Sequence, residues 1–220
     1  MRTRRHWLDG WPSLQNAADL VAFQSSSEAL LERLADDRRL LTQLVDEIER
    51  DPARLDGSRV TLLLNRLCVY QAPERGFEVR IMNPRSANQL VPHDHAYHLS
   101  SRVLRGGYLH AVHRRTDAWE GFFSGDDLLP SVVSVEQPGS SYTLGHAMVH
   151  QAVMLPGTVT LFVHSPRWKP TSHAATDLMP PVTSWPAPAD PGDAPQHSRP
   201  ARLDEYRAMR SELLAQGVIG

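Results

Sequence analysis

The most constraining feature of this chain is a run of short apolar segments between residues 60 and 163, separated by turn residues and uninterrupted by any helical pattern. Such segments, bounded by glycine and proline, are typical of β-strands. About eight short strands in roughly 100 residues favour a β-sandwich or small barrel over a βαβ fold. The expected strands are Val60–Leu64, Phe77–Met82, Leu99–Leu104, Tyr108–His113, Val132–Val135, Ser141–Leu144, Met148–Met154 and Thr158–Val163.

Helices are expected on both sides of this β-region. Residues 1–56 are predicted to form a helical region packed on the barrel, with Ser27 as a helix N-cap and apolar residues at helical spacing after it. The barrel is expected to span residues 57–179 and a proline-rich linker residues 180–201. Residues 202–220 are expected to form a short helix that docks on the barrel or on a second copy of the chain, in a homodimer.

Composition excludes several classes of partner. A net charge of −2 over 220 residues offers no basic surface for nucleic acid. No apolar run reaches the roughly 18 residues of a membrane-spanning helix, and the basic start is not followed by the apolar core of a secretory signal. The single cysteine, Cys68, excludes a disulfide framework and fits a reducing compartment. We therefore expect a cytoplasmic protein that binds a small molecule, not nucleic acid or a membrane.

Histidine is the residue type that points to chemistry, because eight of the eleven lie between His93 and His164. His93 and His95 point to the same side of an extended segment, with their Cα atoms about 6.6 Å apart, so both can bind one divalent ion. The third ligand must come from another strand, and His150 is the candidate. Three neutral imidazoles leave coordination positions open for water, substrate or O2, as in catalytic metal sites.

Other polar residues are candidates to act beside this metal. His164 alternates with Thr160 and Phe162, so it is expected on the side of His150, either as an acid, base or hydrogen-bond donor or as a hydrogen-bonded core residue. Tyr97 and Tyr142 are further catalytic candidates, although packing on the barrel rim is the more common role of such residues.

Arginines on the predicted strands are the candidate substrate-binding residues. A guanidinium on a strand is costly unless it is paired or faces water. Its planar set of donors suits a carboxylate or a phosphate. The substrate-binding candidates are Arg66, Arg80 and Arg102.

Two stretches of the chain resemble the two sequence motifs of the cupin superfamily. Pro92-His93-Asp94-His95, followed by Gly106-Gly107, resembles the first motif. The stretch from Gly145 to His150, followed by Pro156-Gly157, resembles the second. This likeness covers about residues 60–170. It implies a mainly β fold of the cupin type, a double-stranded β-helix that forms a small jelly-roll barrel.

Within the cupins, the chain most resembles the cysteine-dioxygenase-like thiol dioxygenases, which also place helices before the barrel. His93-Asp94-His95 matches their His-Asp-His, and His150 follows Ser141-Tyr142 as their third histidine follows a small residue and tyrosine. A run from Thr160 to Pro166 is similar to their strand that ends in Ser-Pro. The resemblance implies one Fe(II) held by three histidines, with O2 and substrate at adjacent positions.

The chain also departs from these families. Leu99 and Ser100 occupy the positions where many cupins have a glutamate ligand, which leaves a three-histidine site. Ser100 and His164 replace the cysteine and tyrosine that are crosslinked in the eukaryotic thiol dioxygenases. Arg66 lies one position from the arginine that binds the substrate carboxylate in that family and would face the other way on a regular strand. The resemblance therefore does not identify cysteine as the substrate.

Three functions are consistent with these patterns. The first is a mononuclear non-heme Fe(II)-dependent oxygenase or dioxygenase, with O2 as co-substrate and a small polar, carboxylate-bearing, amino-acid-like or thiol substrate. The second is a non-redox isomerase, lyase or rearranging enzyme that uses Zn(II) or Mn(II) as a Lewis acid. The third is a cupin that binds a small ligand without catalysis. The fold does not decide among them.

Overall fold

The computed structural model describes residues 19–61, 64–72, 77–84, 88–89, 91–117, 121–178 and 198–220. Residues 1–18 of the expected helical region and residues 180–197 of the expected linker lie outside the described residues. The last part of that linker is described, and it contributes the short strand β11 (Arg199–Pro200) to a sheet.

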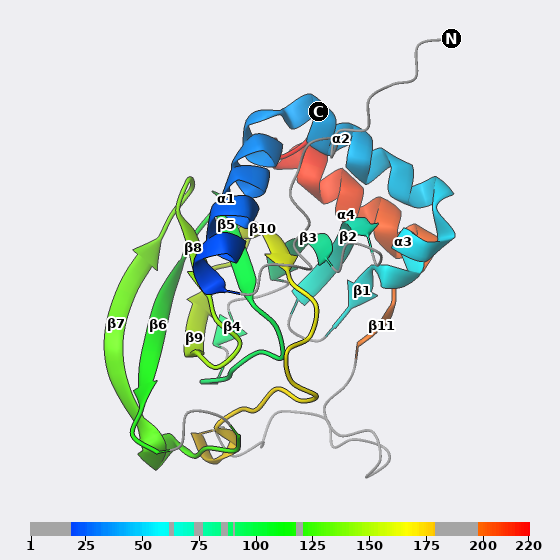
Figure 1. Cartoon of the computed structure of the whole chain (residues 1–220). Helices are drawn as coiled ribbons and strands as arrows, with labels where there is room; N and C mark the ends of the chain where they lie inside the picture. Colours follow the sequence, from blue (N-terminus) through cyan, green and yellow to red (C-terminus); the bar gives the residue numbers. More distant parts are fainter. Residues whose placement is uncertain are drawn as a thin grey trace.

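Two antiparallel sheets form the body of the protein (Figure 1). The four-stranded sheet has the order β4 (Asn88–Gln89), β9 (Val149–Met154), β6 (Tyr108–Arg115) and β7 (Leu128–Glu136). The seven-stranded sheet has the order β11, β1 (Arg59–Val60), β2 (Leu64–Ala72), β3 (Phe77–Pro84), β10 (Val159–His164), β5 (Leu99–Arg105) and β8 (Ser141–Leu144). The mainly β, jelly-roll fold class expected from the sequence is confirmed.

Side chains of both sheets meet in the barrel interior. Val103 of the seven-stranded sheet packs with Tyr108 and Ala152 of the four-stranded sheet. Phe162, also from the larger sheet, belongs to a second cluster against which Val112 of the smaller sheet packs. The two sheets therefore enclose a common interior, and the inward-facing residues of each strand are the ones available to build a site.

The first expected strand is placed differently by the structure. In place of one strand over Val60–Leu64, β1 ends at Val60 and the long strand β2 begins at Leu64. A bulge lies between Cys68 and Tyr70 of β2. Successive buried residues next to the bulge interrupt the alternation of apolar and polar residues, which is the signal by which a strand is recognised in a sequence.

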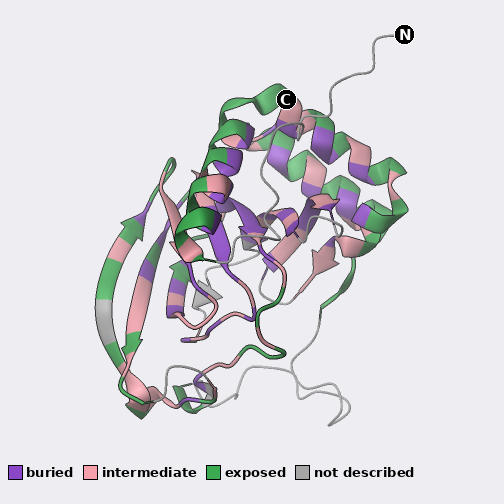
Figure 2. Cartoon of the chain, viewed as in Figure 1, coloured by how far each residue is buried: buried purple, intermediate pink, exposed green. Residues whose placement is uncertain are grey.

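Helices cover the outer face of the seven-stranded sheet (Figures 1 and 2). They are α1 (Leu20–Asp36), α2 (Arg38–Glu47), which continues into a 3-10 turn (Ile48–Arg50), α3 (Pro52–Gly57) and α4 (Leu203–Ala215). Alternate residues of the central strands, such as Val79, Ile81 and Leu161, are buried against these helices. The C-terminal helix α4 docks on the body, where Tyr206 is fully buried and its hydroxyl donates to the Val45 carbonyl at 2.8 Å.

Ser27 is not the helix N-cap that the sequence indicated. Helix α1 begins earlier, and Asp19 caps it by accepting a hydrogen bond from Ala22 N at 2.7 Å. Ser27 lies inside the helix, where its hydroxyl donates to the Phe23 carbonyl and contacts Ser100 of β5. Aspartate and serine are both good caps, so local sequence does not distinguish the two positions, and tertiary contacts place Ser27 on the buried side. Among the described residues, no helix is long and apolar enough to cross a membrane.

Candidate metal site

An isolated antiparallel β-bridge brings His93 and His150 together. His150 is the second residue of β9, and His93 lies in the loop that precedes β5. The backbone N–H of each residue donates to the carbonyl of the other, both at 2.9 Å. The His93-Asp94-His95 loop is thereby fixed beside β9, which allows two histidines from one segment and a third from another to converge.

The ring nitrogens of His93, His95 and His150 lie within 4.8 Å of one another. The Nε2 atoms of His95 and His150 are 2.9 Å apart. Two ligands about 2.1 Å from one ion, in adjacent coordination positions, would be about 3 Å apart. The Nδ1 of His93 donates to the Val91 carbonyl at 2.8 Å, which leaves its Nε2 free to bind. The donor set therefore fits a single divalent ion.

Burial keeps these imidazoles in the form that binds metal. Desolvation, followed by repulsion from His93 and Arg66, lowers the pKa of His95 well below its usual value. Desolvation and the neighbouring histidines lower the pKa of His150 in the same way. Both rings are thus neutral at pH 7 and need not lose a proton to bind an ion.

Asp94 anchors the loop that carries two of the three histidines. Its carboxylate is fully buried, accepts from Lys169 Nζ at 2.5 Å and accepts from the backbone N–H of His173 at 2.7 Å. The backbone N–H of Asp94 donates in turn to the His173 carbonyl at 2.9 Å. Asp94 points away from the histidine nitrogens and holds their loop against the segment that follows β10.

His164 and Tyr97 form a column with His95. The Tyr97 ring stacks on His164 at 4.4 Å and on His95 at 5.5 Å between centroids. Both nitrogens of His164 face acceptors, since Nδ1 donates to the Ser165 carbonyl at 2.8 Å and Nε2 lies 3.5 Å from the Glu78 carboxylate. Tyr97 is therefore the side chain of this column that contacts a candidate ligand, and His164 lies behind it.

Arg66 and Arg80 face the same interior but differ in their partners. Arg80 donates twice to the Glu78 carboxylate, at 2.7 and 2.8 Å. The Nε of Arg66 is buried without a hydrogen-bond partner, and no ion pair found among the described residues includes this arginine. Arg66 lies close enough to lower the pKa of both His93 and His95. Within the described residues, Arg66 is thus a cation without an ion-pair partner beside the three histidines, with the charge of Glu78 in its vicinity.

Comparison with known proteins adds a likeness of fold. No family model matches the chain, and no curated protein matches it. Similar solved structures include KdgF from Halomonas sp., with 20% identity, 49% of this chain and 84% of that chain covered, and a TM-score of 0.37. An RmlC-like cupin from Shewanella frigidimarina has 18% identity, covers 48% and 78% of the two chains and gives a TM-score of 0.35. The DMSP lyase DddQ from Ruegeria pomeroyi has 10% identity, covers 56% and 59%, and gives 0.39.

One of these similar structures is a cupin. Structural similarity at TM-scores below 0.5 does not indicate an activity, so the function is inferred from the residues of the site itself. The narrower likeness to the thiol dioxygenases stays a prediction.

Two of the candidate residues are not brought into direct contact with the three histidines. Arg102 pairs with Leu161, whose side chain packs under the helices, and donates to Ser141 at 3.1 Å. It therefore lies on the outer face of β5, away from the site, because paired residues of adjacent antiparallel strands point to the same face of the sheet. Tyr142 does face inward, but it stacks on His110 at 4.2 Å and accepts a hydrogen bond from the Tyr108 hydroxyl at 2.9 Å.

Sequence reasoning missed His110, Glu136 and Glu78. The alternation of β6 gave no reason to place His110 inside, yet it is only 2% exposed. Its position became clear only from the pairing of β6 with β9. A signal for Glu78 was present, because Glu78 and Arg80 alternate on an otherwise apolar strand and so share one face.

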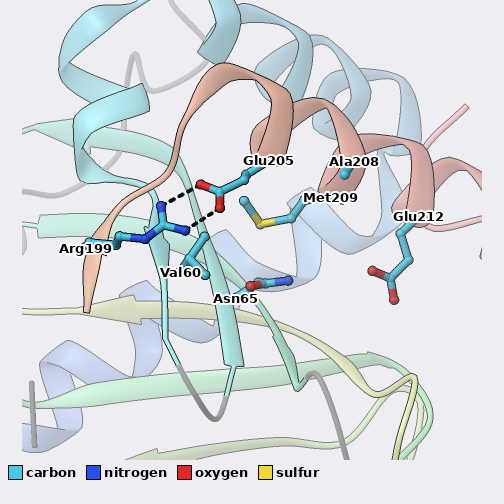
Figure 3. A pocket seen from close by; sticks show the side chains of 7 residues that line it. All are labelled: Val60, Asn65, Arg199, Glu205, Ala208, Met209 and Glu212. Atoms are coloured by element: carbon cyan, nitrogen blue, oxygen red, sulfur yellow. Dashed lines mark hydrogen bonds and ion pairs between the residues drawn. The ribbon is translucent and has the colours of Figure 1, made fainter. Parts of the chain in front are cut away.

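A separate pocket of about 260 Å³ lies between the edge of the seven-stranded sheet and α4 (Figure 3). It is lined by Val60, Asn65, Arg199, Glu205, Ala208, Met209 and Glu212. The Arg199 guanidinium and the Glu205 carboxylate within it satisfy each other. None of the histidines of the candidate site lines this pocket, and its remaining charged group, Glu212, accepts a hydrogen bond from Gln216 at 3.0 Å.

Proposed function

We propose that this chain is a metal-dependent enzyme of the cupin type, and specifically an Fe(II)-dependent oxygenase or dioxygenase that acts on a small carboxylate-bearing substrate. One observation carries the proposal: three neutral imidazoles converge near the guanidinium of Arg66, whose buried Nε has no hydrogen-bond partner among the described residues. The metal would be held by His93, His95 and His150. Among the described residues, this candidate ligand group contains no carboxylate or thiolate.

The donor set explains the preference for an anionic substrate. Three neutral ligands leave the full charge of a divalent ion uncompensated, so the site attracts a thiolate, carboxylate or enolate. A bound ferrous ion would supply the redox chemistry with O2. Tyr97, whose ring stacks on His95, would donate a hydrogen bond to a substrate at these positions, and His164, stacked on the other side, would support the Tyr97 ring.

Arg66 would bind the substrate carboxylate. Arg80 cannot serve equally well, because Glu78 already neutralises it through two hydrogen bonds. A carboxylate would satisfy the buried Nε of Arg66 and offset the cost of leaving that cation unpaired.

Replacement of Arg66 tests this role. We expect Arg66→Gln to raise the apparent KM for a carboxylate substrate tenfold or more, from the loss of about 1.5–3 kcal/mol of a charge-assisted hydrogen bond. The matched control is Arg102→Gln, which removes an arginine on the outer face of β5, away from the three histidines. The measurement is steady-state kinetics with the carboxylate and with its amide. Equal KM values for the Arg66 and Arg102 variants would dismiss the assignment.

Metal analysis of anaerobically purified protein, combined with O2 uptake, tests the activity itself. Iron together with substrate-dependent O2 uptake is the expected result. Zinc or manganese without uptake would instead support the non-redox isomerase or lyase. The partly buried pair of Glu78 and His164 beside Tyr97 favours that second candidate, since a carboxylate and an imidazole suit proton transfer. Protein that takes up no metal would leave only a ligand-binding role.

A further inference from the structure

A chain of three side chains runs away from the metal site on the four-stranded sheet. The Nδ1 of His150 lies 3.0 Å from the Nε2 of His110. The Nδ1 of His110 lies 3.6 Å from the Glu136 carboxylate, which is ion-pair distance rather than a hydrogen bond. Ser134 donates to the same carboxylate oxygen at 2.6 Å. All three members of the chain are buried.

Strand register places these side chains in one row. On β6, His110 lies two residues from Val112, which is paired with His150 of β9. On the other side of β6, His110 is paired with Ser134 and Tyr108 with Glu136 of β7. Paired residues of antiparallel strands, and residues two apart on one strand, share a face. The row therefore crosses three adjacent strands on the inner face of the sheet.

The geometry allows one arrangement of protons when His150 binds a metal. The Nε2 of His150 faces His95 and must carry the lone pair, so the proton is on Nδ1 and is donated to His110. The Nε2 of His110 must then accept, which puts the proton of His110 on Nδ1, facing Glu136. The Glu136 carboxylate favours this arrangement over the one with the His110 proton on Nε2, because a negative charge stabilises an N–H that points towards it.

We infer that His110 and Glu136 are positioning residues of the metal site, which hold His150 in the orientation and tautomer that bind an ion through Nε2. The inference rests on the three-histidine site of the proposed function. It goes beyond that function because it assigns a role to two residues that contact neither the ion nor the substrate. Partners of this kind around metal-binding histidines contribute about 10- to 100-fold in affinity.

The test is the dissociation constant of Co²⁺ from the full-length apoprotein, measured anaerobically by visible absorption. His110→Phe keeps a ring but removes the acceptor, and it is expected to weaken binding about 10- to 100-fold. His110→Gln retains an acceptor for the His150 N–H and should bind within a few-fold of wild type. His113→Phe is the matched control, because no hydrogen bond or ring contact within the described chain joins His113 to a ligand histidine.

Glu136→Gln gives a second measurement that does not depend on how His110→Phe folds. It should weaken Co²⁺ binding less than His110→Phe does, but measurably. Wild-type affinity in both folded variants would overturn the inference, as would equal losses for His110→Phe and His110→Gln, which would indicate packing alone. Failure of the wild-type protein to bind Co²⁺ would instead contradict the proposed function.

Discussion

Glu78 is the counter-charge of Arg80 in the barrel interior. Each of its carboxylate oxygens accepts a hydrogen bond from Arg80, and the Nε2 of His164 lies 3.5 Å from Oε2. Burial alone would raise the pKa of this carboxyl, but the nearby His164 ring and the hydrogen bonds from Arg80 outweigh burial and lower the pKa to about 2. Glu78 is therefore ionised throughout the physiological pH range, and its negative charge contributes to the stability of the folded state.

This lowered pKa predicts how stability depends on pH. The folded-state pKa lies below the ordinary value of 4.5, so Glu78 stabilises the fold above that value and the contribution is lost as pH falls towards 2. Glu78→Gln should lower the free energy of unfolding at pH 7 by about 1.5–3 kcal/mol. In urea denaturation series, the gap between variant and wild type should narrow between pH 4.5 and pH 2. A constant gap would mean that the charge of Glu78 does not matter.

Cys68 is expected to be chemically inert in the native protein. It is fully buried, and burial followed by the charge of Glu78 raises the pKa of its thiol. The reactive thiolate is thus disfavoured. Iodoacetamide at pH 8 should label Cys68 in urea but not in the folded chain, as followed by intact mass. Rapid labelling of the native protein would show that this thiol is accessible.

At the scale of elements, the loop of His93 and His95 depends on a buried ion pair. Asp94→Asn keeps the shape of the side chain but leaves the Lys169 ammonium, itself largely buried, without its counter-charge. We expect a loss of about 3 kcal/mol in the free energy of unfolding, as for other broken buried pairs.

Asp117→Asn is the control for that variant. Asp117 follows the end of β6 and pairs with Arg115, and its loss should destabilise the fold much less than the loss of Asp94, because solvent screens an exposed carboxylate. Chemical denaturation of both variants measures the difference. Equal effects would show that the buried pair with Lys169 does not hold the loop.

Several elements could be predicted from the sequence because their signals are local. The alternation of residues identified seven of the eight expected strands within a few positions, and the i,i+2 spacing of His93 and His95 placed both on one side. The inward direction of Arg66 could not be predicted. Residues 66 and 68 of β2 pair with Met82 and Arg80, whereas after the bulge Gln71 pairs with Glu78, so the parity of inward residues changes along the strand.

At the scale of the whole molecule, the two faces of the seven-stranded sheet have different roles: the outer face contributes most of the apolar burial, and the inner face contributes residues of the candidate site. The outer face carries the apolar residues that pack under α1, α2 and α4, where much of the ribbon is buried (Figure 2). The inner face carries Arg66, Glu78 and Arg80. Because most apolar burial lies on the outer side, substitutions at the three histidines should leave the fold intact. The sequence could not predict which face of the sheet would hold the site, because that depends on the order of the strands and on the face that the helices cover.

The metal content of single-histidine variants tests the three-histidine site most directly. Wild-type protein purified anaerobically should hold one ion per chain by elemental analysis. His93→Ala, His95→Ala and His150→Ala should each lose most of it while keeping the wild-type circular dichroism spectrum. His146→Ala should retain the ion, because His146 is not one of the grouped ligands and packs against His98 and Trp168. Full metal content in His150→Ala, with the ion lost from His146→Ala, would contradict the account.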